Sequence, residues 1–228
     1  MNKNNYYSQK LSAERLQLCY EIAPHRVKQY LKTEIEFVLS KVNRTDLVLE
    51  SGCGYGRVLI KLMEKAKTVV GIDTSLESLR LAQKKLVSGR PSSCYLSVMN
   101  AVELGFSDRL FDMVICIQNA ISAFKVNQRK LIKEAIRVTR IGGTVLLSSY
   151  SENFWEDRLQ WFQLQADYGL IGEIDYNQTG DGVIVCHDGF SATTISPDEF
   201  VALTSGLDVK PRISEVDSSS VFYEMDVG

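Results

Sequence analysis

Apolar and polar positions in the middle of the chain alternate between two spacings. Residues 47–49 form a short apolar run shortly before Gly52, which is typical of a buried strand. In residues 57–67, apolar side chains recur on one face of a helix. Residues 68–72 form a second apolar run, and it ends at Asp73. This part of the chain therefore predicts a strand, a helix and a second strand.

The same alternation continues to about residue 150. Thr74 and Glu77 have the spacing of a capping box, so a helix is expected to begin there. Further strands are predicted over residues 95–99, 111–117 and 144–149, and Asn127 can cap a helix before the last of them. Such alternation favours a parallel, doubly wound α/β sheet. Ligands of these sheets bind beyond the carboxyl ends of the strands, so the turn over residues 50–56 is the expected site.

That turn has the pattern E-x-G-x-G-x-G and runs from Glu50 to Gly56. Gly52, Gly54 and Gly56 permit a tight turn and let a ligand approach the backbone closely. The N-terminus of the following helix offers unpaired N–H groups. A dinucleotide fingerprint would need a small residue where Arg57 stands. A reductase that uses NAD is therefore the weakest of the alternatives.

Two acidic residues extend the pattern. Glu50 precedes the turn and suits a ligand that carries positive charge, such as the ammonium and sulfonium groups of S-adenosylmethionine (SAM), better than a pyrophosphate. Asp73 lies 21 residues after Gly52 at the end of the second strand, where an acid can accept both ribose hydroxyls. The alternative is that the glycines only connect a strand to a helix, and the two acids argue against it.

Residues 46–150 resemble the core of the class I SAM-dependent methyltransferases, with similar motifs at residues 48–57, 69–75, 99–101 and 111–119. The resemblance implies a Rossmann-like, mostly parallel seven-stranded sheet with one antiparallel strand near the C-terminus. It implies SAM as cofactor and S-adenosylhomocysteine as product. The cofactor-binding residues that it implies are Glu50, Gly52, Gly54, Gly56, Arg57, Asp73, Thr74, Asn100, Ala101 and Gln118.

The resemblance also implies a role for several of these residues. The glycines would surround the methionine moiety with support from Glu50, Asp73 would hold the ribose, and Thr74 would contact the adenine. Asn100 stands where the family usually has an aspartate, but its amide oxygen can still accept a hydrogen bond from the adenine amino group. Ile141 stands where proline is common, which is a smaller departure.

Two features count against DNA as the acceptor. Amino methyltransferases of nucleic-acid bases carry an Asn/Asp-Pro-Pro-aromatic motif after the fourth strand, whereas residues 118–121 read Gln-Asn-Ala-Ile. The formal net charge of −2 gives no general electrostatic reason for nucleic-acid binding. A basic cluster within residues 129–140 falls on an amphipathic helix and is interpreted as a solvated face. RNA remains open.

A single domain is expected, with residues 45–150 as its cofactor core. Residues 1–44 are expected to form a helical cover, residues 151–200 an α/β insert, and residues 201–228 a C-terminal strand pair. By resemblance, such additions cover the carboxyl ends of the strands and select the acceptor. The aromatic helix predicted near residues 155–168 either packs onto the domain or forms a lid over an apolar or cationic acceptor. The candidate acceptor-binding residues are Tyr7, Asn119, Phe154 and Trp155.

Methyl transfer from a sulfonium is an in-line displacement that needs alignment and desolvation more than acid–base chemistry. A base is required only if the acceptor atom arrives protonated. Histidine is the side chain that most often serves as a base near neutral pH, so His25 in the helical cover is a candidate, and Tyr20 is a second one. A packing role is the alternative for His25. No metal is expected, because His25 and His187 are far apart in sequence.

Composition places the chain among ordinary globular proteins, with 228 residues of which 45% are hydrophobic. The five cysteines are odd in number, widely spaced and without a CxxC pair, which favours reduced thiols and a cytoplasmic protein. Neither a signal peptide nor a membrane-spanning run is visible. The expected partner is a small-molecule methyl acceptor, and the expected state is a monomer or homodimer. Methylation of protein or RNA, or non-catalytic SAM binding, are the alternatives.

Overall fold

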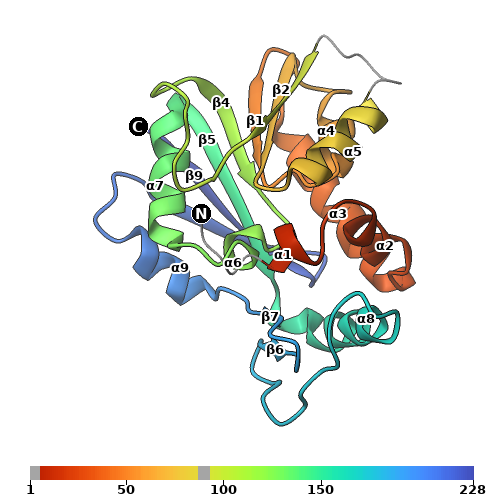
Figure 1. Cartoon of the computed structure of the whole chain (residues 1–228). Helices are drawn as coiled ribbons and strands as arrows, with labels where there is room; N and C mark the ends of the chain where they lie inside the picture. The colour runs from red at the N-terminus through yellow and green to blue at the C-terminus, as the bar shows by residue number, and fades with distance from the viewer. Residues whose placement is uncertain (1–5, 87–92) are drawn as a thin grey trace.

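A computed structural model describes residues 6–86 and 93–228, which form one large sheet with helices on both faces (Figure 1). The strand order is β3-β2-β1-β4-β5-β9-β8. Neighbours from β3 to β5 are parallel, whereas β9 runs antiparallel to both of its neighbours. This arrangement confirms the predicted doubly wound sheet with one antiparallel strand. The strands are β1 (Leu47–Ser51), β2 (Thr68–Asp73), β3 (Cys94–Val98), β4 (Phe111–Cys116), β5 (Thr139–Tyr150), β8 (Pro211–Val216) and β9 (Ser220–Asp226).

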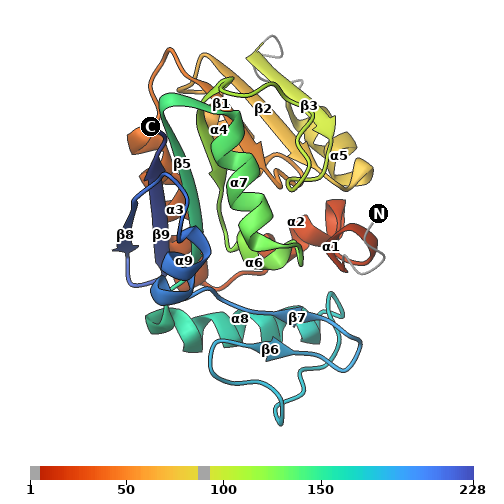
Figure 2. The same ribbon diagram turned by 90° about the vertical axis from the view of Figure 1, so that its left-hand side faces the viewer.

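Each face of the sheet packs against its own set of helices, and in Figure 2 α7 of the second set lies in front of the sheet. One set is α3 (His25–Lys41), α4 (Arg57–Leu62) and α5 (Leu76–Leu86), and the other is α6 (Ala120–Ala123), α7 (Gln128–Val138) and α9 (Pro197–Thr204). Val48 of β1 packs in the first core and Leu49 in the second, and neither is exposed. Because successive side chains of a strand point to opposite faces, a parallel strand buried on both faces is an apolar run.

A glycine in β2 determines how closely one helix approaches the sheet. A Cβ at Gly71 would lie 2.6 Å from Leu59 Cδ1 and 2.9 Å from Cys53 Sγ. Glycine at this position therefore lets α4 and the turn before it lie directly on the sheet.

Two predicted boundaries were wrong. The helix α5 does not begin with a Thr74–Glu77 capping box, because Ser75 Oγ accepts the Ser78 N–H at 3.1 Å instead. The strand β5 begins at Thr139, before the glycine pair that was expected to precede it. At Gly143 the neighbouring strand is so close that a Cβ would lie 2.7 Å from the Asp112 carbonyl oxygen. Glycine has no Cβ, so β5 can run through this position.

The N-terminal helices and the insert share a third hydrophobic core. They comprise α1 (Tyr6–Gln9), α2 (Ala13–Glu21), the 3₁₀ turn η2 (Glu152–Phe154), α8 (Trp155–Asp167) and the short strands β6 (Ile184–Val185) and β7 (Ser191–Ala192). In both views α8, β6 and β7 form a separate layer beyond one end of the sheet, on the same side as α1 and α2 (Figures 1 and 2). Within the described segments, no helix has the length and apolar character that crossing a membrane requires.

We predict that Gly143→Ala destabilises the protein by about 1–3 kcal/mol, because the added methyl group would press on the carbonyl oxygens of Asp112 and Arg140, which lie in regular backbone. Urea unfolding measures the loss. Gly180→Ala is the matched control, since no atom lies within 4 Å of a Cβ built there. Equal effects of the two substitutions would contradict the packing argument.

Candidate active site

A cavity of about 530 Å³ lies at the carboxyl ends of β1, β2 and β4. Its volume is within the range of small-ligand sites. The turn after β1 and the ends of the neighbouring strands form one side, and α1, α2, α3 and α8 contribute the other. The expected site is therefore a pocket between the sheet and the cover.

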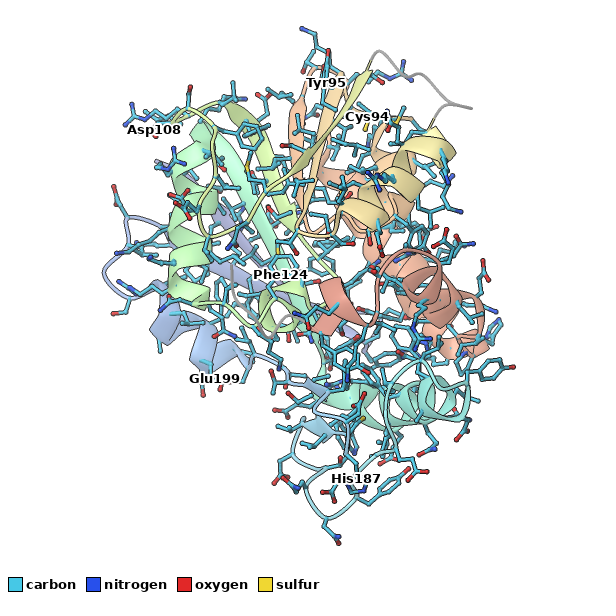
Figure 3. All side chains as sticks on the ribbon, in the orientation of Figure 1. Cys94, Tyr95, Asp108, Phe124, His187 and Glu199 are labelled. Atoms are coloured by element: carbon cyan, nitrogen blue, oxygen red, sulfur yellow. The ribbon has the colours of Figure 1, made fainter. Side chains whose placement is uncertain are left out.

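The glycine turn meets this cavity through two of its three glycines. Gly52 and Gly54 line it and have φ angles of 78° and 51°, a left-handed conformation that glycine adopts without strain. A Cβ at Gly52 would overlap the Phe124 ring, which Figure 3 labels close to α1. Gly56 is outside the lining, and a Cβ there would lie 3.1 Å from Ala82 Cβ of α5. The third glycine therefore serves helix packing.

Asp73 ties the end of β2 to the glycine turn. Its Oδ2 accepts the Gly54 N–H at 2.9 Å, and its Oδ1 accepts the Ser75 N–H at 2.8 Å. Burial raises the pKa of Asp73, although these backbone hydrogen bonds oppose the rise. A carboxylate has about four lone-pair sites, so Asp73 can still accept from a ligand in the cavity.

Thr74, Asn100 and Ala101 line the same end of the cavity, as predicted residues of the adenine region. Asn100 Oδ1 accepts the Val102 N–H at 3.2 Å, which closes a local turn. Thr74 and Asn100 are exposed, whereas Ala101 is buried. The amide oxygen expected to meet an adenine is therefore already engaged by the backbone with one of its lone pairs.

Glu50 and Arg57 lie behind the lining, under the glycine turn. Glu50 is 4% exposed, and its Oε2 has no hydrogen-bond partner. Burial raises the pKa of Glu50 to about 8, while Arg57 lowers it and Asp73 raises it further. The Arg57 guanidinium lies 4.6 Å from the Tyr20 ring centre and has one unpartnered nitrogen, Nη2. Both side chains hold unused hydrogen-bonding capacity next to the turn.

Tyr20 and Gln118 meet across the cavity. The Tyr20 hydroxyl donates to Gln118 Oε1 at 3.2 Å, and the Gln118 N–H donates to Ser148 Oγ at 2.9 Å. Burial raises the pKa of Tyr20 well above its ordinary value. Tyr20 is therefore a hydrogen-bond donor at neutral pH rather than a ready base.

A buried carboxyl group that the sequence analysis missed continues this network. Glu34 of α3 is 0% exposed, and its Oε1 accepts from Ser148 Oγ at 2.6 Å and from Ser220 Oγ at 3.0 Å. Burial raises the pKa of Glu34 to about 7, although the serine hydrogen bonds lower it. The sequence did contain a signal for its burial. Glu34 follows Leu31 by three residues and Tyr30 by four, which places it on the apolar face of α3.

Aromatic side chains form the remaining wall of the cavity. Tyr7 and Tyr20, which the sequence analysis named, line it. Besides Phe124, four further aromatic residues line it that were not named as site residues: Tyr30, Tyr150, Trp161 and Phe162. The Trp161 Nε1–H donates to the Cys19 carbonyl oxygen at 2.8 Å, which joins α8 to α2.

Three predicted acceptor residues lie outside the cavity lining. Phe154 is buried, with ring centres 4.9 Å from Tyr30 and 6.2 Å from Tyr150. Trp155 lies beside it at the start of α8. Asn119 joins loops, because its Oδ1 accepts from Ser149 Oγ at 3.0 Å and its Nδ2 donates to the Thr193 carbonyl at 2.8 Å. All three support the wall from behind rather than face the cavity.

His25 is also outside the cavity. It is the first residue of α3 and is exposed, because the inward face of that helix belongs to Val27 and Tyr30. The structure therefore gives the predicted base no access to the site. His187 lies far away on the insert (Figure 3). Among the described residues, no cluster of three or more His, Cys, Asp or Glu side chains could hold a metal ion.

Comparison with known proteins agrees with the geometry. Residues 48–143 match the family model of a methyltransferase domain. The malonyl-[acyl-carrier protein] O-methyltransferase of Hamiltonella defensa subsp. Acyrthosiphon pisum (strain 5AT) is 25% identical over 168 residues, which cover 72% of this chain and 62% of that protein. The ubiquinone biosynthesis O-methyltransferase of Paracidovorax citrulli (strain AAC00-1) is 30% identical over 107 residues, which cover 46% and 44%.

A solved structure of a SAM-dependent methyltransferase from Methanosarcina mazei superimposes with a TM-score of 0.62 at 21% identity. The match covers 84% of this chain and 97% of that one. Residues 48–143 thus match a methyltransferase domain, and the chain has the fold of this SAM-dependent methyltransferase. SAM is the cofactor of this family. The chain spans about half the length of the curated relatives that it matches.

The buried carboxyl of Glu34 makes the stability of the protein depend on pH. Its folded pKa of about 7 is above the ordinary value of 4.5, so the folded state binds the proton more tightly and loses stability as pH rises through this window. We predict that Glu34→Gln, whose amide oxygen can still accept from both serines, gains on the order of 3 kcal/mol over wild type between pH 5 and pH 8.

Urea unfolding at pH 5 and pH 8 measures this gain. The same substitution at Glu36, an exposed residue of α3, is the matched control. Parallel pH dependences in wild type and Glu34→Gln would show that this carboxyl is not the source.

Proposed function

We propose that this protein transfers a methyl group from SAM to an oxygen, nitrogen or sulfur atom of a small-molecule acceptor. The observation that carries the proposal is one cavity that joins the glycine turn and Asp73 to an aromatic wall from α1, α2 and α8. Cofactor and acceptor would meet in this cavity. Such a chamber suits a displacement that depends on alignment and desolvation.

The residues at the sheet end fit SAM. The bare backbone of Gly52 and Gly54 allows the methionine moiety to approach, with Phe124 turning away from Gly52. Asp73 would accept the ribose hydroxyls, and Thr74 with residues 100–101 would flank the adenine. The unpartnered Glu50 Oε2 lies under the turn, where a nearby ammonium group would favour the ionised carboxylate that burial alone disfavours.

SAM supplies an electrophilic methyl group and leaves as the neutral thioether S-adenosylhomocysteine. The protein would bind and orient rather than activate. Tyr20 and Gln118, joined by their hydrogen bond, would fix the acceptor side of the cofactor. Burial of the Tyr20 hydroxyl disfavours its ionised form, so we assign it an orienting role.

Support for a small acceptor comes from the wall of the chamber. Its six tyrosine, tryptophan and phenylalanine residues at this end are joined by Leu11, Leu16 and Leu31, and among the described residues the only acidic side chain in the lining is Asp73. A largely apolar pocket of this size suits a small organic molecule better than a protein or RNA strand. The names of the two relatives above, both O-methyltransferases, agree with oxygen as the acceptor atom.

We predict that wild-type protein binds SAM and S-adenosylhomocysteine in calorimetric titrations, and that Asp73→Ala weakens SAM roughly 10–100-fold. The loss has two causes, because the variant removes a charged hydrogen-bond acceptor and releases the Gly54 amide. Asp208→Ala, in an exposed position before β8, is the matched control.

Unfolding curves establish that each variant is folded before titration. Unchanged SAM affinity in Asp73→Ala would remove the ribose assignment. A folded wild-type protein that binds neither ligand would overturn the proposed function. Release of S-adenosylhomocysteine from SAM in the presence of candidate small molecules then tests turnover, and turnover only with protein or RNA would overturn the small acceptor.

A further inference from the structure

Arg158 of α8 is a cation buried without a counter-charge. Its side chain is 1% exposed, and only one hydrogen bond holds it, from Nη1 to the Gly182 carbonyl oxygen at 2.9 Å. Its Nε and Nη2 have no partner. No carboxylate among the described residues forms an ion pair with it. A buried guanidinium with unmet donors is costly, so something outside the described chain is expected to meet it.

Aromatic rings surround this guanidinium. Its Cζ lies 4.5 Å from the ring centre of Tyr150, 5.6 Å from Phe162 and 5.7 Å from Trp155. Cation–π attraction offsets part of the cost of desolvation. A cation–π contact offers no acceptor atom, so it does not replace the hydrogen bonds that the Nε and Nη2 groups lack. The rings therefore account for the position of the guanidinium but leave these two donors without an acceptor.

The guanidinium lies directly behind the end of the cavity that carries the aromatic wall. We call this end, where an acceptor would bind, the acceptor end. Tyr150 and Phe162 separate the two, and both line the cavity. Tyr7 belongs to the same wall, and the charge of Arg158 lowers the pKa of Tyr7 and of Tyr150, although burial raises both. The field of Arg158 therefore acts on the space where an acceptor would bind.

Charged groups on the other elements around this space do not cancel the positive field of Arg158. Glu34 of α3 is a buried acid that acts on Tyr150, and two serine hydroxyls already satisfy one of its oxygens. Asp73 and Glu50 belong to the glycine-turn end. Among the residues that the structure describes, no acidic side chain lines the acceptor end. An anion there would meet an unopposed positive charge, whereas an ammonium group would be repelled.

The pair of free donors selects the shape of that anion. Nε and Nη2 lie on the same edge of a guanidinium and point their N–H bonds in parallel, while Nη1 is taken by Gly182. This edge matches the two oxygens of a carboxylate in a bidentate pair. The aromatic wall in front of it suits a flat, apolar body.

We propose that Arg158 recognises a carboxylate on the methyl acceptor, and that the acceptor is an aromatic or similarly flat acid. This rests on the proposed function, because it names the acceptor of the same site. Tyr7 is the wall residue that turns aside to admit the carboxylate. It lies on the four-residue helix α1, which is held to the insert by a hydrogen bond from the Tyr6 hydroxyl to Asp188 at 2.6 Å. The carboxylate anchors the acceptor and need not be the group that is methylated.

The test compares matched acids and amides in protein saturated with S-adenosylhomocysteine. The probes are hydroxybenzoates and hydroxycinnamates beside the corresponding hydroxybenzamides and hydroxycinnamamides, and calorimetry measures their binding. Wild type is expected to bind at least one acid at least 10-fold more tightly than its amide. Arg158→Met is expected to abolish that preference. Arg158→Lys is expected to retain only part of it, because an ammonium group is a point charge without the two-pronged edge.

Arg26→Met is the matched control. Arg26 also packs on an aromatic ring, with Cζ 5.1 Å from Phe154, but it has its own acid, Asp217, at 2.7 Å. Its loss should leave the preference for acids unchanged. Unfolding curves show which variants are folded, and Arg158→Lys decides the matter if Arg158→Met does not fold.

The outcomes separate the two proposals. Normal binding of S-adenosylhomocysteine with no acid bound in preference to its amide overturns the role of Arg158 and leaves the methyltransferase intact. An acid preference that survives in both Arg158 variants overturns it as well. Failure of folded wild type to bind S-adenosylhomocysteine overturns the proposed function itself.

Discussion

The hydrogen bonds between the end of β2 and the turn after β1 are the constraint on which the site depends. The N–H groups of Gly52 and Cys53 donate to the Ile72 carbonyl at 2.8 and 2.9 Å, and the Gly54 N–H donates to Asp73. The parallel register of β1 and β2, in which Ser51 lies opposite Ile72, brings these groups together. Because the turn is held by its neighbour strand, its left-handed glycines face the cavity, and the carboxylate that would bind ribose is oriented before any ligand arrives.

Around this turn the protein keeps ionisable groups in places that cost stability. Glu34 and Glu50 are almost fully buried with pKa values raised to about 7 and about 8, and Arg158 is a buried cation without an acid. Each retains at least one unpartnered polar atom. Buried groups of this kind weaken the folded state unless a ligand satisfies them, and they gather at functional sites for that reason. Their placement on two sides of one cavity supports a site that is completed by cofactor and acceptor together.

The cover turns the open end of the sheet into a chamber. Trp161 joins α8 to α2 through the Cys19 carbonyl, and the guanidinium of Arg15 donates to the carbonyls of Gly169 and Leu170 at 2.7 and 3.0 Å. Segments about 150 residues apart in the chain thus share one hydrophobic core above the cofactor turn. A chamber whose walls come from separate elements can change its acceptor through the insert without disturbing the sheet, because the cofactor side and the acceptor side have different supports.

The sequence by itself determined the sheet, the glycine turn and Asp73, because short buried strands, turns and caps depend on neighbours within a few residues. It misplaced the start of β5, where Gly143 fits a strand contact made far along the chain. It also favoured His25, which has the right chemistry but faces solvent, and did not name Glu34, Trp161 or Arg158 as site residues. Only the tertiary structure decided which side of each covering helix meets the cavity, because that depends on how α2, α3 and α8 pack together. No local pattern in the sequence encodes the direction of a contact between distant segments.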